Sequence, residues 1–328
     1  MAAGGVVLLV LLSIGGIFLT TNASRRATQT ALAAIEPSHT PRPSSTITDT
    51  PAPPTATPTP LPTFTNTPPP PTASLTPTIV PTQVSEVDGM PLLYVPAGEF
   101  LMGSIDSDSE ANPDEKPQHT VYLDAFWIDQ TEVTNAMYKL CVQAGLCHAP
   151  SDTTYYANAK FGNSPVGYVS WNDAQAYCHW AGRQLPTEAQ WEKAARGIDG
   201  RLYPWGNSSI TGNLANFCDI HCQLDWKDKA INDGYAVFSP VGNYPAGASP
   251  YGALDMAGNV WEWVADWYGE NYYASSPSNN PIGPDSGQVR ILRGGSWDNE
   301  AQYYMRAAVR SRFNPDYRLG YLGFRCSR

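Results

Sequence analysis

Residues 40–82 are built almost wholly from Pro, Thr, Ser and Ala, and this run limits where the chain can fold. Half of the 30 prolines of the chain lie between Pro37 and Pro81. Proline removes backbone donors and fixes φ, and the run has no apolar periodicity to bury, so it cannot form a packed core. We therefore expect residues 27–83 to be a disordered Pro/Thr-rich stalk and a globular domain to occupy residues 84–328.

The residues before the stalk predict a targeting segment. Gly4 to Thr20 form an uncharged apolar run, close to the ~17–25 residues that span a bilayer, so residues 1–26 are typical of a signal anchor or a signal peptide. Arg25 and Arg26 follow the run, and the positive-inside rule alone would place the remainder in the cytoplasm. Composition and cysteine content favour export instead. We expect an extracytoplasmic protein, membrane-anchored through this segment or secreted.

The charge balance narrows the choice of partners. The chain of 328 residues has a formal net charge of -10, and such a surface repels nucleic acid. Clustered carboxylates would suit a hard cation such as calcium. The 10 Trp and 18 Tyr lie mostly in the globular part, and a domain this rich in Trp and Tyr with so few charges is more often extracellular than cytosolic.

Helix signals are few, and they predict a loop-rich α+β domain. Ser170 and Asp173 have the spacing of a capping box before a helix that ends near Gly182, and Thr187 with Gln190 begins a second helix. A third helix is expected over residues 132–144. Most of residues 198–290 shows no periodicity, so this part needs disulfides or bound ions to hold it.

The six cysteines allow two interpretations. Spacing suggests two local disulfides, Cys141 with Cys147 and Cys218 with Cys222, which leaves Cys178 and Cys326, although spacing alone does not determine connectivity. The alternative is a zinc or copper site in the segment "CDIHC", where Cys218, His221 and Cys222 are joined by Cys147 and His148. Disulfides are favoured because the expected compartment is oxidising.

Six segments occur in an order typical of one family: "YVPAGEFLMGS", "VSWNDAQAYCHWAGRQLPTEAQWEKAARG", "YPWGN", "GALDMAGNVWEWVADWY", "RGGSW" and "GFRC". Together they resemble the formylglycine-generating enzyme family, also called the sulfatase-modifying factor family. The resemblance covers the globular part and implies a compact C-type-lectin-like fold with little regular structure. It also implies a disulfide between Cys178 and Cys326.

The resemblance further implies two structural calcium ions, bound by side-chain and backbone oxygens. The implied ligands of the first ion are the side chains of Asn216 and Asp233 and the carbonyls of Phe217 and Tyr235. Those of the second are the side chains of Asp255 and Glu262 and the carbonyls of Gly258 and Val260. Hard oxygen donors in a loop-rich region agree with calcium. The alternative is that Asp255 and Glu262 cap turns and pair with arginine.

The catalytic part of the family pattern is missing. Family oxidases convert a substrate cysteine to formylglycine with copper(I) held by two cysteines after the "GGS" segment, and soft thiolates are the ligands that copper(I) needs. Here the residues after Ser296 read "WDNEAQYYMRAAVRSRF", without cysteine. Copper is therefore not expected, and an oxidase would need a divergent metal site such as "CDIHC".

The first hypothesis for function is therefore a surface-tethered module that binds a peptide, protein or glycan. The same segment resembles ligand-binding family members that retroelements diversify. The expected groove residues are Ser296, Trp297, Tyr303, Tyr304, Arg306, Arg310, Phe313, Tyr317 and Tyr321. Tyr and Trp make rigid amphipathic contacts, whereas the arginines add charge or brace nearby carboxylates. The other hypotheses are the divergent oxidase and a domain attached to signalling kinases.

Overall fold

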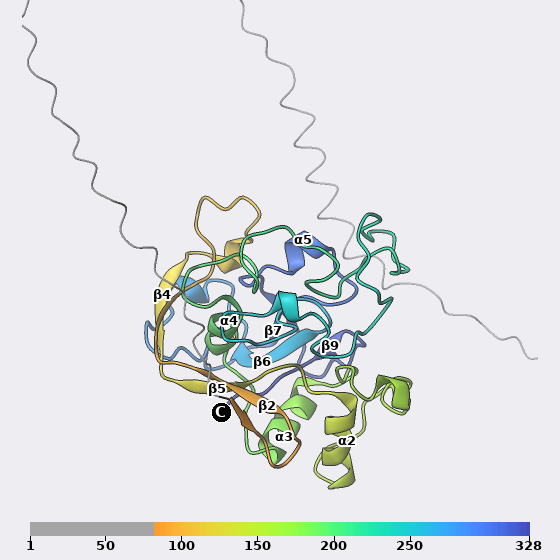
Figure 1. Cartoon of the computed structure of the whole chain (residues 1–328). Coiled ribbons are helices and arrows are strands. Elements are labelled where there is room, and N and C mark those ends of the chain that lie inside the picture. Colours follow the sequence, from red (N-terminus) through yellow and green to blue (C-terminus); the bar gives the residue numbers. More distant parts are fainter. Residues whose placement is uncertain (1–81) are drawn as a thin grey trace, which may run out of the picture. The chain divides into compact units, whose positions relative to one another are not determined.

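The computed structural model of the chain describes residues 82–328, apart from the side chains of Ala301 and Gln302 (Figure 1). The predicted anchor and almost all of the predicted stalk therefore lie outside the described residues. No helix within residues 82–328 is long and apolar enough to cross a membrane. The first strand, β1, begins at Thr82 and so includes two residues that the sequence assigned to the stalk.

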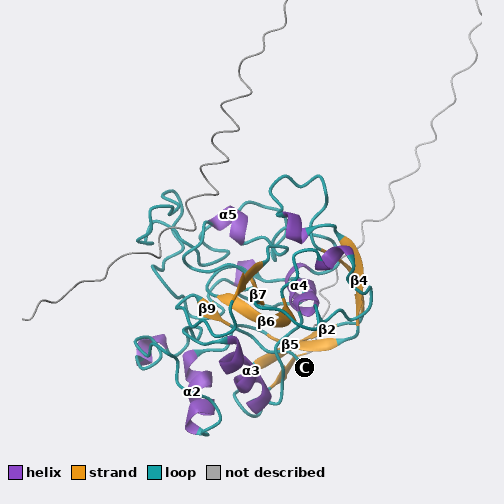
Figure 2. Cartoon of the chain, turned by 180° about the vertical axis from the view of Figure 1, so that it is seen from behind, coloured by secondary structure: helices purple, strands orange, loops and turns teal. Residues whose placement is uncertain are grey.

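Short strands form three separate sheets among loops (Figure 2). The strands are β1 (Thr82–Val84), β2 (Pro91–Val95), β3 (Gly98–Met102), β4 (His119–Leu123), β5 (Phe126–Asp129), β6 (Trp261–Trp267), β7 (Arg290–Arg293), β8 (Ser311–Phe313) and β9 (Leu322–Gly323). The sheet orders are β1-β2-β5, β3-β4 and β8-β7-β6-β9. Every pair is antiparallel except β6 with β9, where Glu262 lies opposite Gly323.

Helices are short, and their starts follow the local sequence signals. The helices are α2 (Asn135–Gln143), α3 (Trp171–Trp180), α4 (Glu188–Arg196) and α5 (Ala301–Tyr304), with 3₁₀ turns η1 (Pro113–Glu115), η2 (Ala159–Phe161), η3 (Pro245–Gly247) and η4 (Tyr272–Ala274). Both predicted capping boxes are present: Ser170 accepts a hydrogen bond from the Asp173 amide at 3.2 Å, and Thr187 accepts one from the Gln190 amide at 3.2 Å. Such caps contribute about 1 kcal/mol each.

The first helix, α2, buries its expected face only in part. The sequence periodicity predicts an inward face that includes Leu140 and Cys141; Cys141 is fully buried, but Leu140 is exposed and Tyr138 is fully buried. Tyr138 stacks on Tyr177 of α3 with ring centroids 5.6 Å apart, so packing against the neighbouring helix decides which side of α2 is buried.

A buried set of ion pairs surrounds α4, which contacts β3, β4, β6 and β7. We call it the arginine-matched cluster. Its pairs are Glu115 with Arg306, Glu188 with Arg310, and Glu192 with both Arg196 and Arg293. Arginine attraction lowers the pKa of Glu192 against the opposing effect of burial, so Glu192 is ionised. Each carboxylate in this cluster thus has a cation supplied by the chain itself.

Three disulfides stabilise this loop-rich fold, and none of the six cysteines is free. The pairs are Cys141–Cys147, Cys178–Cys326 and Cys218–Cys222. This is the pairing that the spacing suggested, and it includes the helix-to-C-terminus bond implied by the family resemblance.

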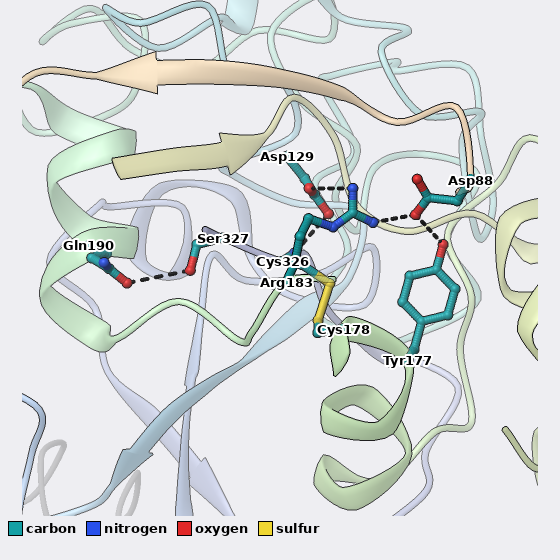
Figure 3. Close-up of a disulfide and its surroundings, with 8 residues drawn as sticks. All are labelled: Asp88, Asp129, Tyr177, Cys178, Arg183, Gln190, Cys326 and Ser327. Atoms are coloured by element: carbon teal, nitrogen blue, oxygen red, sulfur yellow. Dashed lines mark hydrogen bonds and ion pairs between the residues drawn. A yellow bond between two sulfur atoms is a disulfide. The ribbon is translucent and has the colours of Figure 1, made fainter. Parts of the chain in front are cut away.

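The long-range disulfide links α3 to the C-terminal segment beside a buried ion pair (Figure 3). Arg183 pairs with Asp88 and lies 3.3 Å from Asp129, while the Tyr177 hydroxyl donates to Asp88 at 2.7 Å. A buried polar network therefore links Asp88, near the start of the described chain, to α3 and Arg183, and the disulfide links α3 to the C-terminal segment.

Residues 197–260 contain no strand and no α-helix, and their only helical piece is η3. This agrees with the expected loop-rich region. The backbone there is held instead by side-chain acceptors, and most of the predicted calcium ligands lie in it.

Candidate functional site

The first predicted calcium ligand set is assembled in the structure around Asp233. The Asp233 carboxylate accepts hydrogen bonds from the Phe217 amide at 2.8 Å and the Tyr235 amide at 2.9 Å. Asn216 precedes Phe217 and is 1% exposed; its Nδ2 donates to the Val237 carbonyl at 2.7 Å, but its Oδ1 is buried without a hydrogen-bond partner. An oxygen left in this way costs about 1–3 kcal/mol unless something binds it.

The charge at this set is not balanced by the chain. Asp233 and the adjacent Asp219 are buried, and neither takes part in any ion pair recorded among the described residues. Burial raises the pKa of Asp233 to about 7, and the negative charge of Asp219 acts in the same direction. A bound cation would remove this penalty.

The second predicted set lies on the tight loop that leads into β6. Asp255 has a left-handed backbone with φ 56°, and its carboxylate accepts the Gly242 amide at 2.6 Å. Gly258 is required because a Cβ there would lie 2.2 Å from the Asn216 carbonyl oxygen. The Asn259 amide donates to the same oxygen at 2.9 Å, so the two ligand sets share a backbone contact.

Glu262 of the second set is an ion-pair partner. Its carboxylate accepts from Arg325 Nε and Nη2, both at 2.7 Å, and from Trp191 Nε1 at 2.8 Å. The arginine pairing left open by the sequence is therefore what the structure shows for Glu262. No ion pair is recorded between Asp255 and an arginine in the described chain, and burial raises the pKa of Asp255 to about 6.

Sequence reasoning missed Glu132, which faces the second set from the residues before α2. It is fully buried, its Oε1 has no hydrogen-bond partner, and its Oε2 receives only a 3.3 Å contact from Asn259 Nδ2. Burial, followed by repulsion from Asp255 and Glu262, raises the pKa of Glu132 well above its ordinary value. Arg325 attracts it but is already bonded to Glu262.

The buried charges of the two predicted ligand sets are together called the carboxylate-rich cluster; Glu132, Asp255 and Glu262 interact with one another, and Asp233 interacts with Asp219. Its members are Glu132, Asp219, Asp233, Asp255, Glu262 and Arg325. In residues 82–328 no three Asp, Glu, His or Cys side chains converge as a single metal site. Each predicted ligand set keeps one carboxylate that is not in an ion pair, Asp233 or Asp255, together with amide and backbone oxygens. These oxygen donors fit a hard cation such as calcium rather than a soft metal or one that prefers imidazole ligands.

The alternative metal site in "CDIHC" is wrong. Cys218 and Cys222 are bonded to each other, and Cys147 is bonded to Cys141, so none of them offers a thiolate. The His221 ring instead lies 3.1 Å from Asn232 Oδ1. The divergent oxidase hypothesis thereby loses the soft ligands on which it rested.

The segment expected to hold copper in family oxidases is a turn of hard oxygen groups in this chain. Ser296 Oγ donates to Asp298 Oδ1 at 2.6 Å and lies 2.9 Å from Asn299 Oδ1, which also accepts the Ser296 amide at 3.1 Å. Burial raises the pKa of Asp298. Ser296 itself is fully buried and so does not offer a surface contact.

The predicted groove aromatics are partly exposed but fall into separate groups. Phe313 contacts Tyr317 and Tyr321 with centroids 5.6 Å and 6.3 Å away, whereas Tyr303 and Tyr304 contact each other at 4.8 Å. Trp297 packs on Phe238 at 6.2 Å, and its buried Nε1 has no hydrogen-bond partner. These ring contacts place the residues in three groups rather than in one row.

The two groove arginines do not offer free charge. Arg306 is 3% exposed and Arg310 4%, because both belong to the arginine-matched cluster. This corrects their prediction as ligand contacts and supports the bracing role. Their partners, Glu115 and Glu188, come from η1 and α4, which the sequence did not place beside them.

One cavity of about 310 Å³ does touch the predicted groove, at Tyr303 and Arg306. Its other lining residues are Asp108, Glu110, Leu202 and Tyr203. Glu115 accepts two hydrogen bonds from Arg306 at 2.8 Å and 2.9 Å, so the charge of the guanidinium is already neutralised by this carboxylate. The cavity is therefore acidic and aromatic, a combination that the sequence did not indicate.

Residues 77–328 match the model of the sulfatase-modifying factor enzyme 1-like domain, and the chain belongs to this family. Its fold resembles the solved structure of PvdO from Pseudomonas aeruginosa, with a TM-score of 0.63, 27% identity and coverage of 76% of this chain and 97% of that one. The family resemblance and the C-type-lectin-like fold expected from the sequence are thus confirmed.

Relatives of the chain carry different names. The formylglycine-generating enzyme of Streptomyces coelicolor is 37% identical over 285 residues, which cover 71% of this chain and 87% of the relative. The mouse protein named inactive C-alpha-formylglycine-generating enzyme 2 is 43% identical over 168 residues, 50% of this chain and 48% of that protein. A serine/threonine-protein kinase pkn1 of Chlamydia caviae is 33% identical over 275 residues, which cover 76% of this chain but 40% of the kinase.

Proposed function

We propose that this domain binds a ligand or a partner protein and does not oxidise cysteine. The observation that carries the proposal is the state of the cysteines: all six are in disulfides, and none lies in residues 297–313, directly after the "GGS" segment. Copper(I) chemistry of the family type needs thiolates that this chain does not supply. One relative is named as inactive, which supports the view that members of this family can keep the fold without the oxidase activity.

The ligand group that fits the 310 Å³ cavity is a cation, such as a Lys or Arg side chain of a protein partner. Glu110 takes part in no ion pair among the described residues and supplies the negative charge, whereas Asp108 lies 3.9 Å from Arg306. Tyr203 supplies aromatic surface, while the Tyr303 ring already has the Arg306 guanidinium 5.0 Å from its centroid. Carboxylates and aromatic faces together attract ammonium and guanidinium groups, with cation–π contributions of about 0.5–2 kcal/mol.

Calcium is proposed as the structural cofactor of the loop region. Asn216, Phe217, Asp233 and Tyr235 would hold one ion, and Asp255, Gly258, Val260 and Glu262 the other, with Arg325 sharing Glu262. A bound calcium ion would supply the positive charge that buried Asp233 and Asp255 have no partner for, and it would accept the unpaired oxygen of Asn216, Oδ1, as a ligand.

An extracytoplasmic location, with tethering through residues 1–26, is part of the same proposal. Three disulfides support it, because disulfides persist in oxidising compartments. Calcium is also abundant enough outside the cytoplasm to occupy sites of modest affinity.

The oxidase question is tested by mass spectrometry. The full chain, loaded with copper(I), is incubated with a peptide bearing a sulfatase-type cysteine motif, and the Streptomyces coelicolor relative is run beside it. We expect no aldehyde from this chain when the relative forms it. Conversion by this chain would contradict the proposal.

The cation preference is tested with two capped peptides, Gly-Arg-Gly and Gly-Gln-Gly, in NMR titrations of the full chain. We expect the Arg peptide alone to shift the signals of Leu202 and Tyr303, and Glu110→Gln to weaken that shift several-fold. Glu270→Gln, at an exposed position outside the cavity lining, is the matched control. Equal shifts with both peptides would refute a cationic ligand group.

A further inference from the structure

A five-residue disulfide loop lies directly beside the first proposed calcium site. Cys218 and Cys222 are bonded with a sequence separation of 4, and both are fully buried. Cys218 follows Phe217, so the loop begins where the proposed ligand segment ends. It contains one acidic residue, Asp219, which is also fully buried.

Asp219 contacts two of the proposed ligand residues. Its amide donates to the Phe217 carbonyl at 2.8 Å, the oxygen proposed to bind calcium. Its Oδ2 accepts the Asp233 amide at 2.7 Å. Asp219 therefore fixes the orientation of one ligand carbonyl and the backbone of the ligand carboxylate.

The disulfide loop in turn fixes Asp219. The Cys222 amide donates to the Asp219 carbonyl at 3.1 Å, and the His221 amide donates to Asp219 Oδ1 at 2.7 Å. Both bonds close within the loop. The covalent bond between its ends restricts how far Asp219 can move from Phe217 and Asp233.

A separate observation indicates that this place takes a ligand. Asn216 Oδ1 is buried without a partner, two residues before the loop, and neither Asp219 nor Asp233 forms an ion pair with a Lys or Arg among the described residues. The side-chain oxygens of this segment are not all satisfied by hydrogen bonds within the chain. An unpaired amide oxygen near buried carboxylates is the kind of donor set that binds a cation.

We infer that Asp219, held by the Cys218–Cys222 disulfide, is a positioning residue of the first calcium site. It orients the Phe217 carbonyl and the Asp233 carboxylate and adds negative charge beside the ion. This inference rests on the proposed calcium binding. Residues that orient metal ligands commonly contribute about 10–100-fold to affinity.

Calcium titration of the full chain by calorimetry tests the inference. Asp233→Asn and Asp255→Asn first assign the two binding events of the wild-type chain to the first and second sites. Asp219→Asn, which retains an acceptor but removes the charge, and Asp219→Ala, which removes both, are then compared. We expect a loss of about 10–100-fold at the first site alone, larger for Ala than for Asn.

The two local disulfides provide a matched control. Cys218→Ser with Cys222→Ser should weaken the first site, whereas Cys141→Ser with Cys147→Ser should leave both calcium affinities unchanged. Unchanged affinity at the second site shows that each variant is folded. First-site affinity that is unchanged in both Asp219 variants overturns the positioning role, and a wild-type chain that binds no calcium overturns the calcium proposal together with it.

Discussion

The arginine-matched and carboxylate-rich clusters both bury several carboxylates, but they neutralise them differently. In the first, Glu115, Glu188 and Glu192 face four buried arginines. In the second, only Glu262 of the five buried carboxylates forms an ion pair with an arginine, Arg325, among the described residues. Burying an unpaired charge is costly, so one cluster is completed by the chain and the other needs protons or bound cations. The comparison separates the ion pairs that stabilise the fold by themselves from the carboxylates whose charge must be neutralised by protons or bound cations.

The largest effect is expected where the chain supplies its own cations. Glu192→Gln leaves Arg293 and Arg196 without their buried anion, and breaking such a pair costs about 3–5 kcal/mol in the free energy of unfolding. Urea denaturation of the full chain should show the same loss with calcium and with EGTA. A loss that depends on calcium would mean that the two clusters are not independent.

Calcium removal should give the next largest effect, and it should act on the other cluster. At calcium about 100-fold above Kd, binding to one site stabilises the folded state by about 2.7 kcal/mol. We expect EGTA to lower Tm of the wild-type chain and to have a smaller effect on Asp233→Asn. Equal shifts in the two proteins would remove Asp233 from the ligand set.

The pH dependence of stability should differ between calcium-free and calcium-loaded protein. Burial raises the pKa of Asp233 to about 7 and of Asp255 to about 6, above the ordinary aspartate pKa of 3.8, so the calcium-free folded state holds extra protons. Its free energy of unfolding therefore falls as pH rises from about 4 to 7. Calcium binds the ionised forms, so its stabilising effect should increase over the same range.

Two other buried carboxylates contribute a background to that measurement. Burial raises the pKa of Asp129 and of Asp266 to about 7, and both lie outside the proposed calcium ligands. They add a fall in stability with rising pH that calcium does not remove. The difference between the calcium-loaded and calcium-free curves isolates the carboxylate-rich cluster, and parallel curves would contradict its role.

The smallest effect is expected for Glu132→Gln, the counterpart of Glu192→Gln. Burial and the neighbouring carboxylates raise the pKa of Glu132 and so favour its neutral form in calcium-free protein, and Gln has nearly the same shape as that form. Denaturation in EGTA should therefore show a change of at most about 1 kcal/mol. A loss as large as that of Glu192→Gln would show that Glu132 is ionised and paired.

Local features of the molecule could be predicted from the sequence itself, whereas the one long-range contact predicted, the Cys178–Cys326 disulfide, came from the family resemblance. The capping boxes at Ser170 and Thr187 depend on residues three positions apart, so their pattern alone determines them. Glu132 meets Asp255 and Glu262 only after folding brings together residues more than 120 positions apart. The same holds for Arg306 and Arg310. They were expected to contact a ligand, but they form ion pairs with buried carboxylates that are distant in the sequence.

The measurement that most directly tests the contrast between the clusters is a crystal structure of the chain grown with calcium, with anomalous difference maps. The account predicts a peak among Asn216, Phe217, Asp233 and Tyr235, another beside Asp255, and none within the arginine-matched cluster. Maps without a peak at either ligand set, from crystals soaked in millimolar calcium, would contradict the account.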